Sequence, residues 1–310
     1  MKIENDSPNT RCNVLLLEKI NHRFKRMTKT KQSSGLSICI DHISKSVNGI
    51  QRAEIDNIEN ILSAIQKWKP KKIVLEGIWV SRQFIEKIKH YYSNLEIFVH
   101  VHSNVPFLVC ESTAIQNFMM YQSLGVGIIF NSSNAYEAFI CLEKSIYLPN
   151  IYVLTEYESK KEPNEFIDVG CFGSVRILKN QVIQALAAAN LARRLGKKLR
   201  FHMNLGRGEG KNDAIISTLK GVFTLHSDAE LISVPWQEHK DFIQYCRGLD
   251  IGIQVSLSET FNIVSADYVS AGIPIVVSQD VCWADQSSIA STSSPKDIEN
   301  KMWLNIKHHK

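Results

Sequence analysis

The stretch DIGIQVSLSETFNIVSADYVSAGIPIVVS, residues 250–278, decides the fold of this chain. Its apolar run at 251–255 predicts a buried strand, the helical spacing of apolar residues over 263–271 predicts a helix, and 273–277 predicts a second strand. A strand, a helix and a strand in this order are the repeating unit of a parallel sheet that helices cover on both faces. The segment therefore predicts an α/β protein.

The same alternation runs through the rest of the chain. In the first half it predicts strands at 13–17, 52–55, 72–75, 97–101, 126–130 and 151–154, with helices at 36–47, 58–68, 82–91, 112–124 and 134–142. In the second half it predicts strands at 167–171, 199–203, 230–233, 251–255 and 273–277, with helices at 180–195, 213–220, 239–246 and 263–271. We expect two Rossmann-like, doubly wound domains that face a cleft.

A change in composition predicts the domain boundary. The segment EYESKKEPNE, residues 156–165, is charged, contains a proline and has no apolar periodicity, which is typical of an interdomain linker. We expect an N-terminal domain at 1–157, a second domain at 166–294, and a C-terminal helix or tail at 295–310 that packs across the hinge.

Composition limits the class of protein. A chain of 310 residues with 44% hydrophobic content can form two cores of ordinary size. It has no apolar run long enough for a membrane span, and its amino terminus lacks the residue order of a signal peptide, so we expect a cytoplasmic protein. Its seven cysteines form no CxxC pair, which favours reduced thiols, and a net charge of +5 is too small to indicate a nucleic-acid partner.

The turn before the helix at 263 is a candidate phosphate site. Phe261, Asn262 and Ile263 lie where a strand has ended and a helix begins, so backbone N–H groups and the helix dipole can hold an anion. Glu259 precedes this helix and Asp267 lies inside it, and carboxylates suit the recognition of sugar hydroxyls. The alternative is an ordinary helix start at which acidic residues are favoured by the dipole.

A second turn carries two cations. The segment DVGCFGSVRILKN, residues 168–180, predicts a strand followed by a turn at Gly173, after which come Arg176 and Lys179. Either cation alone is typical of a solvated loop. Both together, beside Glu259, make a purely solvated role improbable.

Polar and aromatic residues follow two other predicted strands. Val234 and Trp236 lie between a strand end and a helix, where the tryptophan either flanks a ligand or packs in the core. His100 and His102 share one face of the strand at 97–101, and we expect His100 to be a core histidine. A zinc site at this His-x-His would need a third ligand that the sequence does not indicate, so we expect no metal.

The chain resembles the retaining GT-B glycosyltransferases. Their Glu-x7-Glu pattern, followed by a small residue, Gly and Pro, is matched by Glu259, Asp267, Gly272 and Pro274, with aspartate in place of the second glutamate. Together with IVLEGIWV, HVHSNVPFL and CFGSVRILKN, these residues are similar to a group of GT-B enzymes of tailed bacteriophages, over nearly the whole chain.

The resemblance implies a nucleotide-sugar donor, a UDP-sugar, on the second domain and an acceptor on the first. The implied catalytic residues are Glu259, His102, Arg176 and Lys179, and the implied donor-binding residues are Gly173, Val234, Trp236, Phe261, Asn262, Ile263 and Asp267. In that scheme the two cations neutralise the diphosphate, Asp267 binds the ribose, Glu259 positions the sugar and His102 contacts it. The turn at Val234 and Trp236 would seat the base.

The acceptor side is indicated by a basic stretch. Between His22 and Lys31, Arg23, Lys25 and Arg26 stand with two further lysines and no acid, and the stretch leads into a loop at Ser34 and Gly35 that would cover the reacting centre. These cations would contact DNA phosphates, or they form a solvated basic loop.

The sequence therefore predicts a glycosyltransferase that moves a sugar, with retention, from a nucleotide-sugar to an acceptor such as a hydroxymethylated base of phage DNA, in the host cytoplasm. No cofactor and no metal are expected. The alternatives are a polysaccharide, lipid or protein acceptor, or a nucleotide-sugar binding module without turnover. The glycines of NLGRGEG, residues 204–210, do not satisfy GxGxxG, which disfavours an NAD enzyme.

Overall fold

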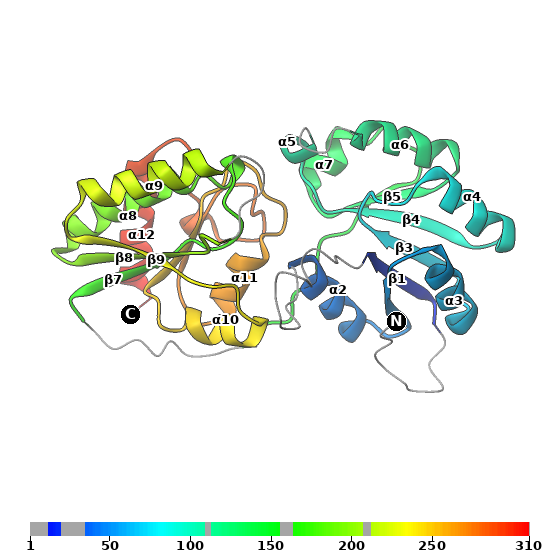
Figure 1. Cartoon of the computed structure of the whole chain (residues 1–310), viewed down its shortest axis with the longest axis horizontal. Coiled ribbons are helices and arrows are strands. Elements are labelled where there is room, and N and C mark those ends of the chain that lie inside the picture. The colour runs from blue at the N-terminus through cyan, green and yellow to red at the C-terminus, as the bar shows by residue number, and fades with distance from the viewer. Residues whose placement is uncertain (1–11, 20–34, 109–112, 156–163, 207–211, 310) are drawn as a thin grey trace. The chain divides into compact units, whose positions relative to one another are not determined.

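The structure is a computed structural model that describes residues 12–19, 35–108, 113–155, 164–206 and 212–309 (Figure 1). The chain forms two compact units, Met1–Val153 and Leu154–Lys310. None of the helices described is both long and apolar enough to cross a membrane.

The first unit contains a parallel sheet in the order β2-β1-β3-β4-β5-β6. Its strands are β1 (Val14–Lys19), β2 (Ile50–Ile55), β3 (Lys72–Glu76), β4 (Glu96–Val101), β5 (Gly127–Phe130) and β6 (Ser145–Tyr147). Its helices are α2 (Gly35–Ser46), α3 (Ile58–Trp68), α4 (Arg82–Tyr91), α5 (Val105–Leu108), α6 (Ala114–Ser123) and α7 (Ser133–Ala138).

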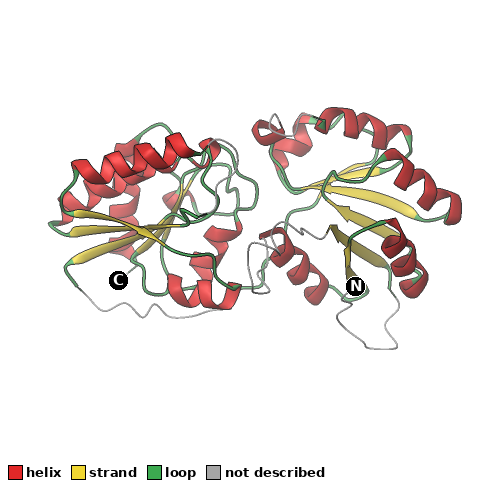
Figure 2. Cartoon of the chain, viewed as in Figure 1, coloured by secondary structure: helices red, strands yellow, loops and turns green. Residues whose placement is uncertain are grey.

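Helices cover both faces of this sheet, as the ribbon shows (Figure 2). Successive residues of β1 point to opposite faces: Leu15 packs in the cluster that contains Ile61 of α3, whereas Leu16 packs with Ile40 of α2. Strands buried on both faces read as continuous apolar runs, which is why VLLL of β1 shows no alternation.

The second unit contains a parallel sheet in the order β11-β10-β7-β8-β9. Its strands are β7 (Phe166–Gly170), β8 (Lys198–Met203), β9 (Ala229–Ser233), β10 (Ile251–Gln254) and β11 (Ile275–Val277). Its helices are α8 (Gln181–Leu195), α9 (Asp213–Leu225), α10 (His239–Cys246), α11 (Ile263–Ser270) and α12 (Pro295–His308), with short 3-10 turns η1 (Ile177–Lys179) and η2 (Gln286–Ser288). Helix α12 packs on α8, where Ile298 and Met302 join the core of this unit.

Glycine explains how closely α11 approaches its sheet. A Cβ placed on Gly252 of β10 would lie 2.1 Å from the ring of Tyr268, and one on Gly170 of β7 would lie 3.0 Å from the Tyr268 hydroxyl. The buried Tyr268 ring therefore rests directly on the backbone of two neighbouring strands. This contact holds α11 against the sheet.

The α/β class and the two parallel sheets confirm the predicted fold. One predicted element is wrong: residues 151–154 form no strand, and the last strand of the first sheet is Ser145–Tyr147 instead. The apolar side chains of Ile151, Val153 and Leu154 are 37%, 50% and 50% exposed, so this apolar run does not mark a buried strand. The helix predicted at 134–142 is also shorter, and ends at Ala138.

Strand order defines where each unit can bind a ligand. In open parallel sheets, ligands bind beyond the carboxyl ends of the strands at which the winding direction reverses. That reversal falls between β1 and β3 in the first unit and between β7 and β10 in the second.

Candidate functional site

The segments that follow β7 and β10 meet at the reversal point of the second unit. The backbone N–H of Leu257 donates to the carbonyl of Leu178, 2.8 Å away, so the two turns are joined directly. Asn180 strengthens the joint, because its side-chain amide donates to the carbonyls of Val255 and Thr292 at 3.1 and 2.8 Å. The two turns form one preorganised surface.

An ion pair occupies the centre of this surface. Lys179 Nζ donates to Glu259 Oε1, and the two side chains are only 11% and 8% exposed. The partly buried pair is matched in charge, which is the condition under which such groups tolerate desolvation. The structure thus brings together two residues, 80 positions apart, that the sequence predicted to share a site.

Gln254 connects this pair to the start of α11. The side chain of Gln254, 1% exposed, donates to the carbonyl of Phe172 at 2.9 Å and accepts from Asn262 at 3.3 Å. Asn262 has a left-handed backbone with φ 55°, and its side-chain carbonyl oxygen caps the helix by accepting from the N–H of Ser265 at 3.0 Å. The predicted phosphate turn is therefore a capped helix start held against β10.

Burial also controls a neighbouring thiol. Burial raises the pKa of Cys171 to about 12, against the opposing attraction of Lys179. Cys171 therefore stays protonated at neutral pH and does not supply a thiolate nucleophile beside the ion pair.

Asn204 ties three turns of the second unit together. Its side-chain oxygen accepts from the N–H of Gly173 at 3.1 Å, and its amide donates to the carbonyl of Val234 at 3.0 Å. Gly173 has φ 110°, a conformation that suits glycine, and begins the turn toward Lys179. The N–H of Val234 donates to the carbonyl of Met203, so its backbone already takes part in the scaffold.

Asp267 faces a histidine. The carboxylate is buried, and its Oδ1 lies 2.6 Å from Nε2 of His239, the first residue of α10. The His239 side chain is 25% exposed, so this pair presents an imidazole rather than a carboxylate. Trp236 lies three residues before His239 and is half-buried.

The turn around Glu259 has an aromatic border. Trp283 Nε1 donates to the carbonyl of Phe261 at 2.6 Å, and the two rings lie 5.7 Å apart. The N–H of Glu259 donates to Asp280 at 3.1 Å. Ile263 begins α11 directly after Asn262, and Arg176 precedes η1, where its carbonyl accepts from the N–H of Lys179 at 3.0 Å.

A second polar cluster lies at the reversal point of the first unit. His100 Nδ1 and His102 Nε2 lie 3.0 and 2.7 Å from the same oxygen of Glu76, the last residue of β3. Burial raises the pKa of Glu76, but the attraction of His100 and hydrogen bonds from both imidazoles outweigh it and lower the pKa to about 2. Burial and the nearby His100 lower the pKa of His102. Asn131 Nδ2 lies 3.4 Å from His102 Nδ1.

The predicted acceptor loop is only partly described. Gly35 is the first residue of α2, whereas Ser34, Arg23, Lys25 and Arg26 lie outside the described residues.

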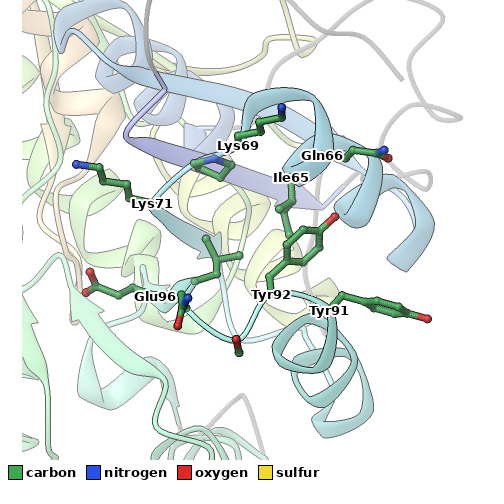
Figure 3. A pocket seen from close by; sticks show the side chains of 11 residues that line it. Ile65, Gln66, Lys69, Lys71, Tyr91, Tyr92 and Glu96 are labelled. Carbon is green, nitrogen blue, oxygen red and sulfur yellow. The ribbon is translucent and has the colours of Figure 1, made fainter.

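An open depression of about 760 Å³ lies at the amino-terminal edge of the sheet of the first unit, where Lys71 and Glu96 lie at the amino ends of β3 and β4 (Figure 3). Ligands of parallel sheets bind at the carboxyl ends, so this depression is separate from the candidate site.

No known protein family and no curated protein sequence matches the chain. Solved structures resemble it in fold. The trehalose-6-phosphate synthase OtsA has a TM-score of 0.68 and 11% identity over 96% of this chain and 93% of that chain. The N-terminal domain of Candida albicans trehalose-6-phosphate phosphatase has a TM-score of 0.70 and 9% identity over 99% and 92%. The E. coli trehalose-6-phosphate protein bound with UDP-2-fluoro glucose has a TM-score of 0.65 and 10% identity over 96% and 93%.

These likenesses define the fold as GT-B, the two-domain architecture of a large group of glycosyltransferases. At 9 to 11% identity they establish the fold and not the activity of this chain. Any argument about the chemistry of this chain therefore rests on the residues at the two reversal points.

Sequence reasoning missed four polar residues that build these sites. They are Gln254, Asn204, His239 and Glu76. Three of them share a signal that the sequence contains, because each is a polar residue that ends an apolar strand or directly follows one. The fourth, His239, starts a helix and gave no such signal.

Proposed function

We propose that this protein is a glycosyltransferase that moves a sugar from a nucleotide-sugar donor, a UDP-sugar, to an acceptor with retention of configuration. The second unit would hold the donor and the first the acceptor. The single observation that carries the proposal is the Lys179–Glu259 pair, which lies at the reversal point of the second unit in a GT-B fold. Lysine at such a point offers a cation to a diphosphate, and glutamate accepts hydrogen bonds from sugar hydroxyls.

The pair suggests how the donor enters. A diphosphate competes with Glu259 for Lys179, because phosphate oxygens carry more charge than one carboxylate. Glu259, released from the lysine, then accepts hydrogen bonds from the sugar. The capped start of α11 adds the favourable end of the helix dipole to the same anion. Since Lys179 and Arg176 supply the positive charge, we propose that diphosphate binding requires no metal ion.

The chemical step follows from this arrangement. The bond between the anomeric carbon and the diphosphate oxygen breaks, and the nucleoside diphosphate leaves with the electron pair. The acceptor oxygen bonds to the anomeric carbon on the same face, and its proton passes to the departing phosphate oxygen. Lys179 and Arg176 stabilise the charge that develops on the leaving group. The protonated thiol of Cys171 takes no part.

The remaining predicted residues have supporting roles in the proposal. Asp267 and His239 bind the ribose as a pair. The ribose reaches the pair at the imidazole of His239, which is more exposed than the carboxylate. Trp236 and the backbone near Val234 border the base. His102, 17% exposed just after β4, is the residue of the first unit for which the resemblance implies a role toward the donor sugar.

The proposed acceptor is a hydroxymethylated base of phage DNA, in the cytoplasm of the host cell. The support is the basic run that contains Arg23, Lys25 and Arg26, together with the resemblance to phage enzymes. Polysaccharide, lipid or protein acceptors, and a binding module without turnover, are the competing possibilities.

Donor consumption tests the proposal. UDP-, GDP- and ADP-sugars are incubated with hydroxymethylated DNA, unmodified DNA or no acceptor, and wild type is compared with Glu259→Ala. Turnover with modified DNA alone, lost in the variant, supports the full proposal. Turnover that requires another acceptor refutes DNA as the acceptor. Nucleotide binding without turnover on any acceptor indicates a binding module instead of an enzyme. Absence of nucleotide binding refutes the donor site.

A further inference from the structure

We propose that Glu76, His100 and His102 form a binding site for a zinc-type divalent cation in the first unit. The three side chains each offer one ligand atom, and these atoms lie within 4.8 Å of one another. Two imidazole nitrogens and one carboxylate oxygen are a donor set that Zn²⁺ favours. The proposal concerns the first unit alone and does not depend on a sugar donor.

Strand geometry explains why these residues converge. Glu76 of β3 and His100 of β4 are direct partners in the parallel ladder, and two positions along the same strand face comes His102. The third ligand that the His-x-His pattern lacked in the sequence is thus supplied by the neighbouring strand. The backbone locks this register, because the N–H of Gly77 donates to the carbonyl of His100 at 2.9 Å.

Unsatisfied buried atoms point to a missing partner. Within the described part of the chain, Glu76 Oε1, His100 Nε2 and Asn131 Oδ1 are buried and have no hydrogen-bond partner. Buried polar groups are nearly always paired, and three exceptions in one cluster require a cause. An ion held between Glu76 and the two imidazoles can bind the unpaired carboxylate oxygen.

The local charge balance favours a cation. Along the same ladder, Glu76 is the direct partner of Glu18 on β1, and Glu18 in turn is the partner of Glu54 on β2. Arg52 binds Glu18 at 2.6 Å and lies 3.9 Å from Glu54. Among the residues that the structure describes, no lysine or arginine lies within ion-pair distance of Glu76. A bound cation would therefore balance the charge of a buried carboxylate that no lysine or arginine neutralises.

The location suits a ligand rather than a purely structural core. Glu76 ends β3, one of the two strands between which the winding of the first sheet reverses. Three protein ligands leave zinc at least one open position, and the His102 side chain is 17% exposed.

Zinc binding by the full chain tests the inference. The protein is prepared without a histidine tag, stripped with a chelator and titrated with Zn²⁺ by calorimetry, with the bound metal counted by mass spectrometry. We expect one zinc per chain, and X-ray absorption should show two imidazole nitrogens with light-atom distances of about 2.0–2.2 Å. Co²⁺ should give the absorption bands of a four- or five-coordinate ion.

Variants decide whether the cluster is the site. Glu76→Gln keeps the shape of the side chain and should weaken binding by more than about 100-fold, beyond the loss typical of an outer-shell residue. His102→Asn, at a partly exposed position, should do the same and covers the case that the buried variant fails to fold. His308→Ala, at an exposed histidine near the C-terminus, is the control and should bind as wild type. Equal affinity in wild type and His102→Asn, loss in the control, or no zinc at all would overturn the inference and establish a hydrogen-bonded network.

UDP binding is measured on the same samples. A protein that binds UDP but no zinc contradicts only the metal site of the first unit. A protein that binds zinc but no UDP contradicts only the proposed donor site. The two proposals therefore fail separately.

Discussion

The two units place different charges at equivalent points of equivalent sheets. At the reversal point of the second unit, a flexible lysine pairs with a glutamate. At that of the first unit, a glutamate is held by two imidazoles on an adjacent strand and its loop. A lysine ammonium on a four-carbon stem can leave its carboxylate for a phosphate, whereas short side chains on paired strands cannot move far. The second site is suited to exchange one anion for another, and the first to hold a cation in fixed geometry.

Removal of Lys179 should have the largest effect and tests whether the second unit is the anion site. We expect Lys179→Ala to lower kcat for sugar transfer by about 10²–10³-fold, because one preorganised charge contact to the leaving group is lost. Steady-state turnover with the best donor measures this. Lys197→Ala, at a lysine of the same unit that binds backbone carbonyls away from the ion pair, is the matched control. A variant with unchanged kcat and donor affinity would remove Lys179 from the mechanism.

The same substitution should also affect stability without ligand. It leaves Glu259 buried without its cation, a change that typically costs about 3–5 kcal/mol. The double variant Lys179→Ala/Glu259→Ala should therefore be less destabilised than the sum of the two single variants. Additive free energies of unfolding in a denaturant titration would mean that the pair is not coupled.

Two closely packed glycines, one in each unit, allow the stability of the two units to be compared. A Cβ on Gly252 would lie 2.1 Å from the ring of Tyr268, and one on Gly127 of β5 would lie 2.4 Å from the ring of Phe98. We expect each alanine variant to destabilise its own unit by at least about 2 kcal/mol through overpacking. Only Gly252→Ala should also weaken UDP binding, because Tyr268 belongs to α11. Calorimetry and UDP titration measure the two effects.

A third glycine, in an uncrowded position, provides the control for these two variants. Gly221 lies within α9, and a Cβ placed there would meet no neighbouring atom within 4 Å, so Gly221→Ala should stabilise by about 0.5–1 kcal/mol. If Gly127→Ala reduced UDP binding as strongly as Gly252→Ala, the donor site would not belong to the second unit alone.

His239 should have an intermediate effect confined to binding. His239→Ala removes the 2.6 Å contact to Asp267, and we expect KM for the donor to rise by about 10-fold with little change in kcat, since one charge-assisted contact is worth about 1.5–3 kcal/mol at most. His239→Gln, which keeps a side-chain N–H, should restore part of the affinity. His226→Ala, at a histidine that contacts Arg193 instead, should match wild type. A drop in kcat with unchanged KM would contradict a role in donor binding.

The sequence predicted most of the fold because its signals are local. Apolar runs and helical spacing mark nearly every element, and the failure at 151–154 arose where apolar side chains are exposed and the backbone joins no sheet. The Lys179–Glu259 partnership was predictable since both residues follow strands of the same sheet. Glu76 as partner of His100 was not, because it depends on the pairing of β3 with β4, which no local pattern specifies. His239 likewise meets Asp267 through the packing of α10 against α11.

The smallest predicted effect compares two left-handed residues, one in each unit. Asn262 has φ 55° and Lys69, at the end of α3, has φ 44°. Glycine adopts this conformation without strain, so Lys69→Gly should stabilise the protein by about 1 kcal/mol. Asn262→Gly should instead destabilise by about 1 kcal/mol, because the buried Ser265 and Gln254 lose hydrogen bonds whose loss outweighs the relieved backbone strain. If thermal unfolding gives stability changes of opposite sign for the two variants, the left-handed backbone at Asn262 serves to position its side chain for these contacts. Equal stabilisation of both variants would show that the asparagine serves only the turn.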